Sequence, residues 1–262
     1  MGDRLHDYVS SGFAKTTDIY ERVRPEYPDA AVDLLARELG LVRGRIVVDV
    51  GAGTGKLTRA LVRTGATVIA VEPLAEMRQR LAVIVPLAVA FDGTAERMAL
   101  RDASAHAITV AQAFHWFDGD QALAEFHRVL VPGGKLALIW NVRDRSVPWV
   151  DAFDAIIDRV DPERPDHQTG RWHDAFERTR DFGPLRQREF GHAQELRPDE
   201  IVERARTVSS IASLPDERRE QVLDEFRALA ETHPELRGRP LVTLPYITRV
   251  YWTERQRISQ IS

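Results

Sequence analysis

The 262-residue sequence contains no cysteine, and this absence excludes disulfide bonds, thiol nucleophiles and thiolate metal ligands together. No apolar run in the sequence approaches the ~18–20 residues that a membrane-spanning helix needs. The N-terminus, MGDRLHDYVS, also lacks the apolar segment of a secretory signal peptide. We therefore expect a cytoplasmic protein without a membrane partner.

Lysine is scarce, with only Lys15, Lys56 and Lys135, so arginine supplies nearly all of the 36 basic residues. The 40 acidic residues leave a net charge of −4, which argues against a non-specific nucleic-acid binder. We accordingly expect no nucleic-acid partner. The preference for arginine has two explanations that the sequence leaves open: a coding bias, or recognition of carboxylate or phosphate groups.

Short aliphatic runs alternate with amphipathic stretches through the first half of the chain. This alternation is typical of a parallel sheet that is covered by helices on both faces. Two later runs add further strands. We expect a doubly wound α/β fold with a mostly parallel seven-stranded sheet, whose strands lie at residues 45–50, 67–71, 87–91, 107–111, 135–140, 185–190 and 246–253, with helices at 57–64, 74–81 and 121–130.

The second half is rich in arginine and acidic residues and has fewer aliphatic runs. Helical patterns there lie at residues 150–160, 200–211 and 217–231, and segments rich in proline and charge at 161–170 and 233–240 are expected loops. We expect a single domain, residues 1–262. Its parts are an N-terminal arm and first helix (1–35), a cofactor-binding core (36–144), cap helices with the sixth strand (145–240) and a last strand (241–262).

The most informative stretch is VVDVGAGTGKLT, residues 47–58, in which a buried strand meets three glycines before a helix. Glycine permits a sharp turn and a close approach of a ligand to the backbone, and the helix offers free amides at its N-terminus. The third glycine of a dinucleotide-binding loop falls at Lys56 and is missing. A Walker phosphate loop is excluded because Leu57 follows the lysine.

Two carboxylates accompany this loop, Asp49 before it and Glu72 at the end of the second strand. A carboxylate ~20 residues after the glycines can accept hydrogen bonds from both ribose hydroxyls of a nucleoside. The alternative is that Asp49 caps the loop amides and Glu72 caps the helix that begins at Leu74. The pair together with the glycine spacing favours nucleoside binding.

Several ordered motifs resemble the class I S-adenosylmethionine-dependent methyltransferases, in particular the type 11 or UbiE-like group that includes relatives of trans-aconitate methyltransferase. The resemblance covers most of the chain. It implies a methyl transfer from S-adenosyl-L-methionine to oxygen, nitrogen or carbon of a small-molecule acceptor. The motifs are residues 47–58, VEPLAEM at 71–77, GTAERMAL at 93–100, ITVAQAFHWFD at 108–118 and RVLVPGGKLAL at 128–138.

The resemblance also implies positions for the cofactor. The methionine part lies against Gly51, Ala52 and Gly53, the ribose is held by Glu72, and Asp49 is a further binding residue. The remaining contacts that it implies are Pro73 and Met77 near the adenine, Ala95 and Glu96 at the adenine edge, Ala111 or Gln112 under the sulfonium, and Tyr20, Arg24 and Tyr27 from an arm at residues 13–28.

His115 follows the fourth strand and is the candidate catalytic residue, because a histidine with a pKa near neutrality can act as a base. The alternative is a histidine that only satisfies a nearby backbone group. The other histidines lack HExxH spacing, so we expect no metal site. Six aromatic residues either line an acceptor pocket or belong to the core: Trp140, Trp149, Trp172, Trp252, Tyr246 and Tyr251.

Two other functions remain open at this point. A nicotinamide oxidoreductase is disfavoured by Lys56 at the third-glycine position. A cofactor-binding protein of the same fold that transfers no methyl group is compatible with every motif, because a fold does not fix a function. The sequence names neither the acceptor nor an oligomeric state.

Overall fold

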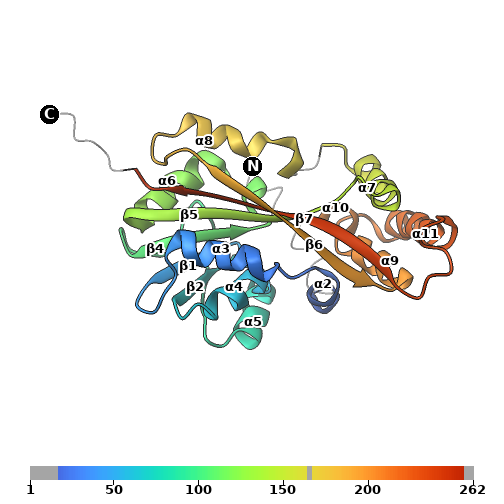
Figure 1. Cartoon of the computed structure of the whole chain (residues 1–262), viewed down its shortest axis with the longest axis horizontal. Coiled ribbons are helices and arrows are strands. Elements are labelled where there is room, and N and C mark those ends of the chain that lie inside the picture. The colour runs from blue at the N-terminus through green and yellow to red at the C-terminus, as the bar shows by residue number, and fades with distance from the viewer. Residues whose placement is uncertain (1–16, 164–166, 257–262) are drawn as a thin grey trace. The chain divides into compact units, whose positions relative to one another are not determined.

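The computed structural model describes residues 17–163 and 167–256, and Figure 1 shows the order of the elements along the chain. The chain divides into two compact units. Unit 1 comprises Met1–Pro25, Asn141–Arg164 and Gly191–Ile247, and unit 2 comprises Glu26–Trp140, Pro165–Phe190 and Thr248–Ser262. The predicted division into an arm, a core and a cap stays a prediction.

Seven strands form one sheet in the order β3-β2-β1-β4-β5-β7-β6. The pairs β3–β2, β2–β1, β1–β4 and β4–β5 are parallel. The predicted seven-stranded, mostly parallel sheet is therefore confirmed. The strands are β1 (Ile46–Val50), β2 (Thr67–Val71), β3 (Val89–Phe91), β4 (Ala105–Ala111), β5 (Leu130–Arg143), β6 (Arg186–Leu196) and β7 (Val242–Glu254).

The strand order reverses between β1 and β4, because β2 and β3 follow on one side and β5 on the other. Val50 pairs with Val71 of β2 and Val110 of β4, so the carboxyl ends of these three strands share one edge. In open α/β sheets, ligands bind outside this edge at the point of reversal. The topology places the glycine loop there.

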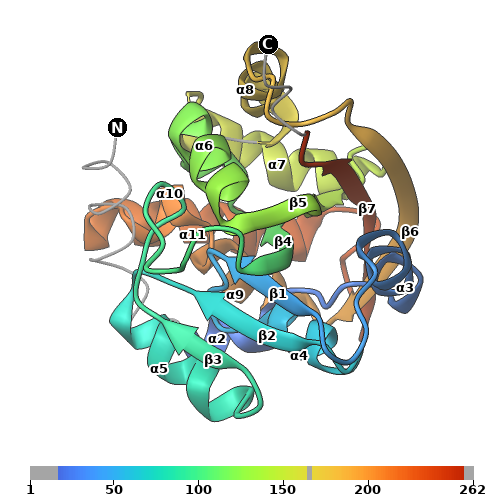
Figure 2. The same ribbon diagram turned by 90° about the vertical axis from the view of Figure 1, so that its left-hand side faces the viewer.

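The helices of unit 2 pack on both faces of these strands. In Figure 2, α4 and α5 lie on one side of β1–β3, and α6 lies on the other side of β4 and β5. Aliphatic side chains from helices and strands share the core, which includes Leu35, Val47, Leu61 and Val68. The helices are α3 (Asp29–Leu39), α4 (Lys56–Val62), α5 (Ala75–Ile84), α6 (Gly119–Val129) and α8 (Asp174–Arg178), with short 3-10 turns η1 (Phe114–Trp116), η2 (His167–Thr169) and η3 (Arg171–His173).

Unit 1 contains a helical core of its own. Trp149, Phe153 and Phe226 are buried in it, and the rings of the two phenylalanines lie 4.7 Å apart. Its helices are α2 (Thr17–Val23), α7 (Pro148–Val160), α9 (Pro198–Arg206), α10 (Ser209–Ala212) and α11 (Asp216–Thr232).

The single helix expected at residues 200–211 is wrong, because α9 ends at Arg206 and α10 begins at Ser209. Thr207 interrupts the helix: its hydroxyl donates to the carbonyl of Arg204 at 2.8 Å, and its own carbonyl accepts from Arg24 at 2.6 Å. Threonine side chains compete for helical backbone groups in this way. The apolar spacing of Ala205 and Val208 gave no sign of the interruption.

Strand β5 begins at Leu130 rather than at residue 135, and it includes the Pro-Gly-Gly stretch that was expected to separate it from α6. The helix ends at Val129, because Leu130 has extended backbone angles. The helix thus ends before the motif, and the strand starts at the next residue without a separate loop.

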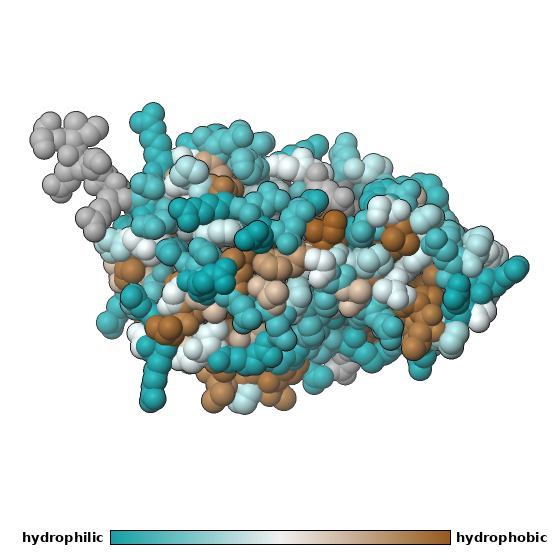
Figure 3. All heavy atoms as spheres, in the orientation of Figure 1, coloured by the Kyte–Doolittle hydropathy of each residue, from teal (hydrophilic) through white to brown (hydrophobic). Residues whose placement is uncertain are grey.

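Among the described residues, few large apolar side chains are exposed. Figure 3 shows a mostly hydrophilic face with an apolar group at its lower margin, where Figure 1 places α5. Val83, Leu87, Val89 and Phe91 are the exposed large side chains around α5 and the edge strand β3. Within the part of the chain that the structure describes, no helix has the length and hydrophobicity to cross a membrane.

Candidate functional site

The loop between β1 and α4 is built from three glycines with positive φ: Gly51 at +67°, Gly53 at +57° and Gly55 at +92°. A Cβ at Gly51 would lie 2.9 Å from Cβ of Ala113, and one at Gly55 would lie 3.0 Å from Cγ of Leu81. A Cβ at Gly53 would meet only Sδ of Met77, at 3.8 Å. Two glycines therefore serve packing, and the third leaves space above the backbone.

Glu72 joins this loop to the end of β2. Its Oε2 accepts from the backbone N–H of Gly53 at 2.8 Å, and its Oε1 accepts from that of Leu74 at 3.0 Å. The side chain is buried, and this burial raises the pKa of its carboxyl, while the two N–H donors act in the opposite direction. Each oxygen keeps a second lone pair for a hydroxyl donor. The nucleoside and helix-cap interpretations of Glu72 are thus compatible.

Asp49 lies beneath the loop within β1 and is fully buried. Its Oδ2 accepts from the hydroxyl of Thr58 in α4 at 2.6 Å, and its Oδ1 accepts from that of Thr109 in β4 at 2.9 Å. Burial, with a contribution from the charge of Glu72, raises the pKa of Asp49 to about 6 despite both hydroxyl donors. The carboxyl connects β1, α4 and β4. Its predicted contact with a cofactor is not tested by these bonds.

The residues expected around the adenine lie near the ends of β2 and β3. Met77 and Ala95 are buried, and Pro73 is exposed. Glu96 accepts from the backbone N–H of Asp118 at 2.9 Å, which ties the turn after β3 to the start of α6. Asp118 is also the N-cap of α6, where its Oδ1 accepts from the backbone N–H of Gln121 at 3.2 Å. The sequence analysis missed this cap, although an aspartate before an amphipathic helix is a typical N-cap.

The segment after β4 carries a strained residue. Gln112 has a φ of +58°, which is uncommon outside glycine, and its N–H donates to the carbonyl of Ile139 at 2.9 Å. It follows Ala111, the last residue of β4, at the edge where the strand order reverses. Strained residues concentrate at functional sites. The predicted position of Ala111 or Gln112 under the sulfonium stays a prediction.

His115 lies in η1 and is held by a buried tryptophan. The indole N–H of Trp140 donates to Nδ1 of His115 at 3.2 Å. Because this bond uses the lone pair of Nδ1, the neutral imidazole carries its proton on Nε2. In this tautomer Nε2 is a hydrogen-bond donor. No pattern in the sequence links residues 115 and 140.

The aromatic residues of unit 2 form a core cluster. Ring centroids lie 4.9 Å apart for Trp140 and Trp172, and 5.0 Å apart for Trp172 and Tyr251. All three side chains are buried, and Trp252 packs against the main core. Trp149 and Tyr246 belong to the core of unit 1. All six residues therefore belong to a core or pack against one, which agrees with the second of the two predicted alternatives.

The arm expected at residues 13–28 is described only from residue 17. Tyr20 and Arg24 belong to unit 1, where the guanidinium of Arg24 lies 5.0 Å from the ring centroid of Tyr20. Tyr27 belongs to unit 2 and is part of its core. The predicted contact of Tyr20 and Arg24 with a cofactor stays a prediction.

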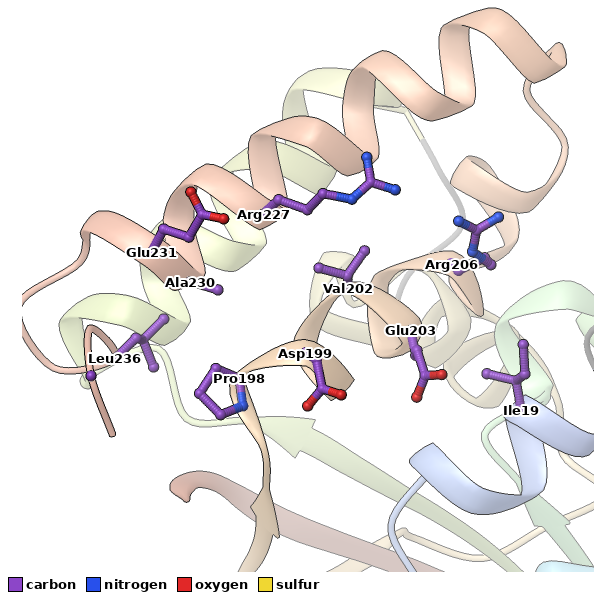
Figure 4. Close-up of a pocket in the computed structure, with 11 residues that line it drawn as sticks. Ile19, Pro198, Asp199, Val202, Glu203, Arg206, Arg227, Ala230, Glu231 and Leu236 are labelled. Carbon is purple, nitrogen blue, oxygen red and sulfur yellow. The ribbon is translucent and has the colours of Figure 1, made fainter. Parts of the chain in front are cut away.

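A separate pocket of about 730 Å³ lies within unit 1, between α9 and α11 (Figure 4). Its two arginines are paired with carboxylates: Arg206 with Glu220 at 3.2 Å, and Arg227 with Glu220 at 3.1 Å. No group of three or more metal-binding side chains occurs among residues 17–163 and 167–256.

Comparisons with known proteins agree with this geometry. The profile of a family described as "Methyltransferase domain" matches residues 48–138. An uncharacterized methyltransferase of Mycobacterium tuberculosis is 38% identical over 241 residues, which are 92% of this chain and 94% of the relative. An uncharacterized methyltransferase of Schizosaccharomyces pombe is 32% identical over 252 residues, 93% of this chain and 97% of the relative.

A solved structure from Anaeromyxobacter dehalogenans, with a provisional assignment as a type II methyltransferase, supports the fold. It has a TM-score of 0.65 at 24% identity and covers 89% of this chain and 97% of its own. The relatives from Mycobacterium tuberculosis and Schizosaccharomyces pombe favour a methyltransferase over a nicotinamide oxidoreductase. The narrower UbiE-like subgroup stays a prediction. The chain belongs to the class I S-adenosylmethionine-dependent methyltransferases.

Proposed function

We propose that the glycine loop of unit 2 binds S-adenosylmethionine and that the enzyme methylates an oxygen, nitrogen or carbon of a small-molecule acceptor. The observation that carries this proposal is the position of Glu72, whose carboxylate lies at the end of β2 and is fixed by Gly53 N–H at 2.8 Å. The space above Gly53 supports it, since a ligand can approach the backbone there.

The residues of the site fit the chemistry of this cofactor. Backbone groups of Gly51, Ala52 and Gly53 would meet its methionine part, and Glu72 would accept from its ribose hydroxyls. Pro73 and Met77 would pack near the adenine, Ala95 and Glu96 would lie at its edge, and Ala111 or Gln112 would lie under the sulfonium.

When bound, the cofactor supplies a methyl carbon that its sulfonium already activates. The main contribution of the protein is then orientation, because holding two reactants in line can lower a barrier by ~7–11 kcal/mol. The backbones of Gly51 and Gln112 suit this task, because each donates its N–H to a strand carbonyl, Gly51 to Val71 at 2.8 Å and Gln112 to Ile139 at 2.9 Å.

We propose that His115 orients the acceptor as a hydrogen-bond donor, because Trp140 occupies Nδ1. His115→Asn is expected to lower kcat by less than about tenfold, whereas losing a general base typically costs 10²–10⁴-fold. The pH dependence of kcat should also keep its shape in the variant. A loss beyond about 100-fold together with the disappearance of one limb of the pH profile would assign His115 as the base.

Gly53→Ala tests the loop. The variant should fold and lose about tenfold in S-adenosylmethionine affinity, because the new methyl group occupies ligand space. Gly40→Ala is the matched control: Gly40 has a similar φ of +64° and no atom within 4 Å of a new Cβ. Both variants should lose similar thermal stability from the strained backbone. Calorimetric titration showing equal affinity for both variants would place the cofactor elsewhere.

The function itself is tested with methyl-labelled S-adenosylmethionine and a metabolite extract. We expect label in small molecules and stoichiometric release of the demethylated cofactor. Binding of the cofactor without any such release would favour the alternative of a binding protein. Transfer of label to macromolecules alone would contradict the small-molecule acceptor.

A further inference from the structure

Two arginines in unit 1 turn their guanidinium groups toward the same neutral residue. Arg24 follows α2, and it donates from Nε to the hydroxyl of Thr207 at 3.1 Å and from Nη2 to the carbonyl of Thr207 at 2.6 Å. Arg204 in α9 is 2% exposed, and its donors lie 3.4 Å from the same hydroxyl and 3.5 Å from the hydroxyl of Tyr246. The hydrogen bonds of Arg204 are therefore long, and both of their acceptors are uncharged hydroxyls.

Neither arginine forms an ion pair with any residue that the structure describes. Arg143, which lies close enough to affect Arg24 electrostatically, is paired with Asp154. The arginines of the pocket in Figure 4 are likewise paired. Burial and the positive charges of Arg204 and Arg143 lower the pKa of Arg24 to about 9, although Tyr20 and Tyr246 act in the opposite direction. Two cations are thus held together without a counter-charge, an arrangement that costs free energy.

The structure offsets only part of this charge. The carbonyl of Thr207 lies just beyond the C-terminal end of α9, where the helix contributes roughly half a negative charge. Nη1 of Arg24 and Nη2 of Arg204 donate no hydrogen bond to a described residue. Planar guanidinium groups with uncommitted donors match the geometry of an oxyanion.

We infer that Arg24 and Arg204 together bind the oxyanion of a small acid, either a carboxylate or a phosphate. The ligand would supply the missing negative charge and accept from the two uncommitted nitrogens. This site lies within unit 1 and does not depend on the cofactor site proposed for unit 2. For these two residues, the preference for arginine in the sequence then reflects recognition rather than coding bias.

The test is calorimetric titration of the full chain with sodium succinate and, separately, with sodium phosphate at constant ionic strength. We expect saturable binding of one acid per chain, weakened about tenfold in Arg24→Gln and in Arg204→Met. Arg22→Gln is the control. Arg22 in α2 pairs with Glu200 and Glu203, so its loss removes a positive charge that already has partners and should change the affinity by less than about twofold. Arg24→Lys, which keeps the charge but loses the planar group, should fall between wild type and Arg24→Gln.

The two acids distinguish the sources of the oxyanion, since a preference for succinate indicates a carboxylate ligand and a preference for phosphate a phosphorylated one. Absence of saturable binding for both acids, or an equal loss in Arg22→Gln, would overturn the inference. S-adenosylmethionine affinity is measured in parallel and should stay unchanged in Arg204→Met. If Arg24→Gln weakens only S-adenosylmethionine binding, Arg24 belongs to the cofactor, as the sequence predicts, and the inference fails.

Discussion

Glu72→Gln is expected to weaken S-adenosylmethionine binding about 10- to 150-fold. A hydrogen bond to a charged group contributes roughly 1.5–3 kcal/mol, and the amide keeps the shape of the side chain while removing the charge that two ribose hydroxyls would share. The carboxylate accepts from the N–H groups of Gly53 and Leu74. In glutamine an NH₂ group replaces one of these oxygens, so one of the two N–H groups loses its acceptor. Calorimetric titration of the folded variant measures the loss.

Glu76→Gln is the matched control, because Glu76 is exposed in the first turn of α5 and undergoes the same change of charge. It should bind the cofactor within about twofold of the wild type. Glu72→Ala is a poorer probe: it leaves two backbone N–H groups without their acceptor, so it should destabilise the loop even without cofactor. Equal affinities of Glu72→Gln and Glu76→Gln would contradict the ribose assignment.

The sequence predicts this part of the molecule well because its signals are local. The run from Val47 to Val50 is continuous and β-branched, as a strand buried on both faces requires. Positive φ at Gly51 and Gly53 follows from glycines at a tight strand-to-helix turn. Glu72 is found from its distance along the chain. Each inference needs only neighbouring residues or a fixed spacing.

Side-chain contacts between distant segments are not predictable in this way. Thr58 and Thr109 bind Asp49 from two different elements, and one of them is 60 residues away in sequence. The bond from Trp140 to His115 depends on the register of β5 beside β4. Such pairs follow from three-dimensional packing, and a single sequence contains no spacing rule for them.

The interruption at Thr207 has the same origin. Apolar residues of α9 and α10 keep a helical spacing that predicts one helix, and they are indeed buried in one core. At the break, the Thr207 hydroxyl donates to the carbonyl of Arg204, and Arg24, 183 residues away, donates to the carbonyl of Thr207. Tertiary contacts override local propensity here.

Asp49→Asn is expected to gain stability relative to the wild type as the pH rises. The pKa of Asp49 is about 6 in the folded protein and about 3.8 in the unfolded chain. Between these values the folded state keeps a proton that the unfolded state has released, so wild-type stability falls as the pH rises. The difference of about two units corresponds to roughly 3 kcal/mol. Asparagine does not ionise, and the hydroxyls of Thr58 and Thr109 can both accept and donate.

The measurement is urea unfolding of both proteins at pH 4 and pH 8. The free energy of unfolding of the variant, minus that of the wild type, should increase by up to about 3 kcal/mol between the two pH values. Asp33→Asn, an exposed change on α3, should give a flat difference. A flat difference for Asp49→Asn as well would mean that the buried carboxyl titrates normally.

Because the charge of Glu72 raises the pKa of Asp49, the increase should be smaller when Asp49→Asn is measured in a Glu72→Gln background. That coupling would connect the buried carboxyl beneath the loop to the residue proposed to hold the cofactor above it.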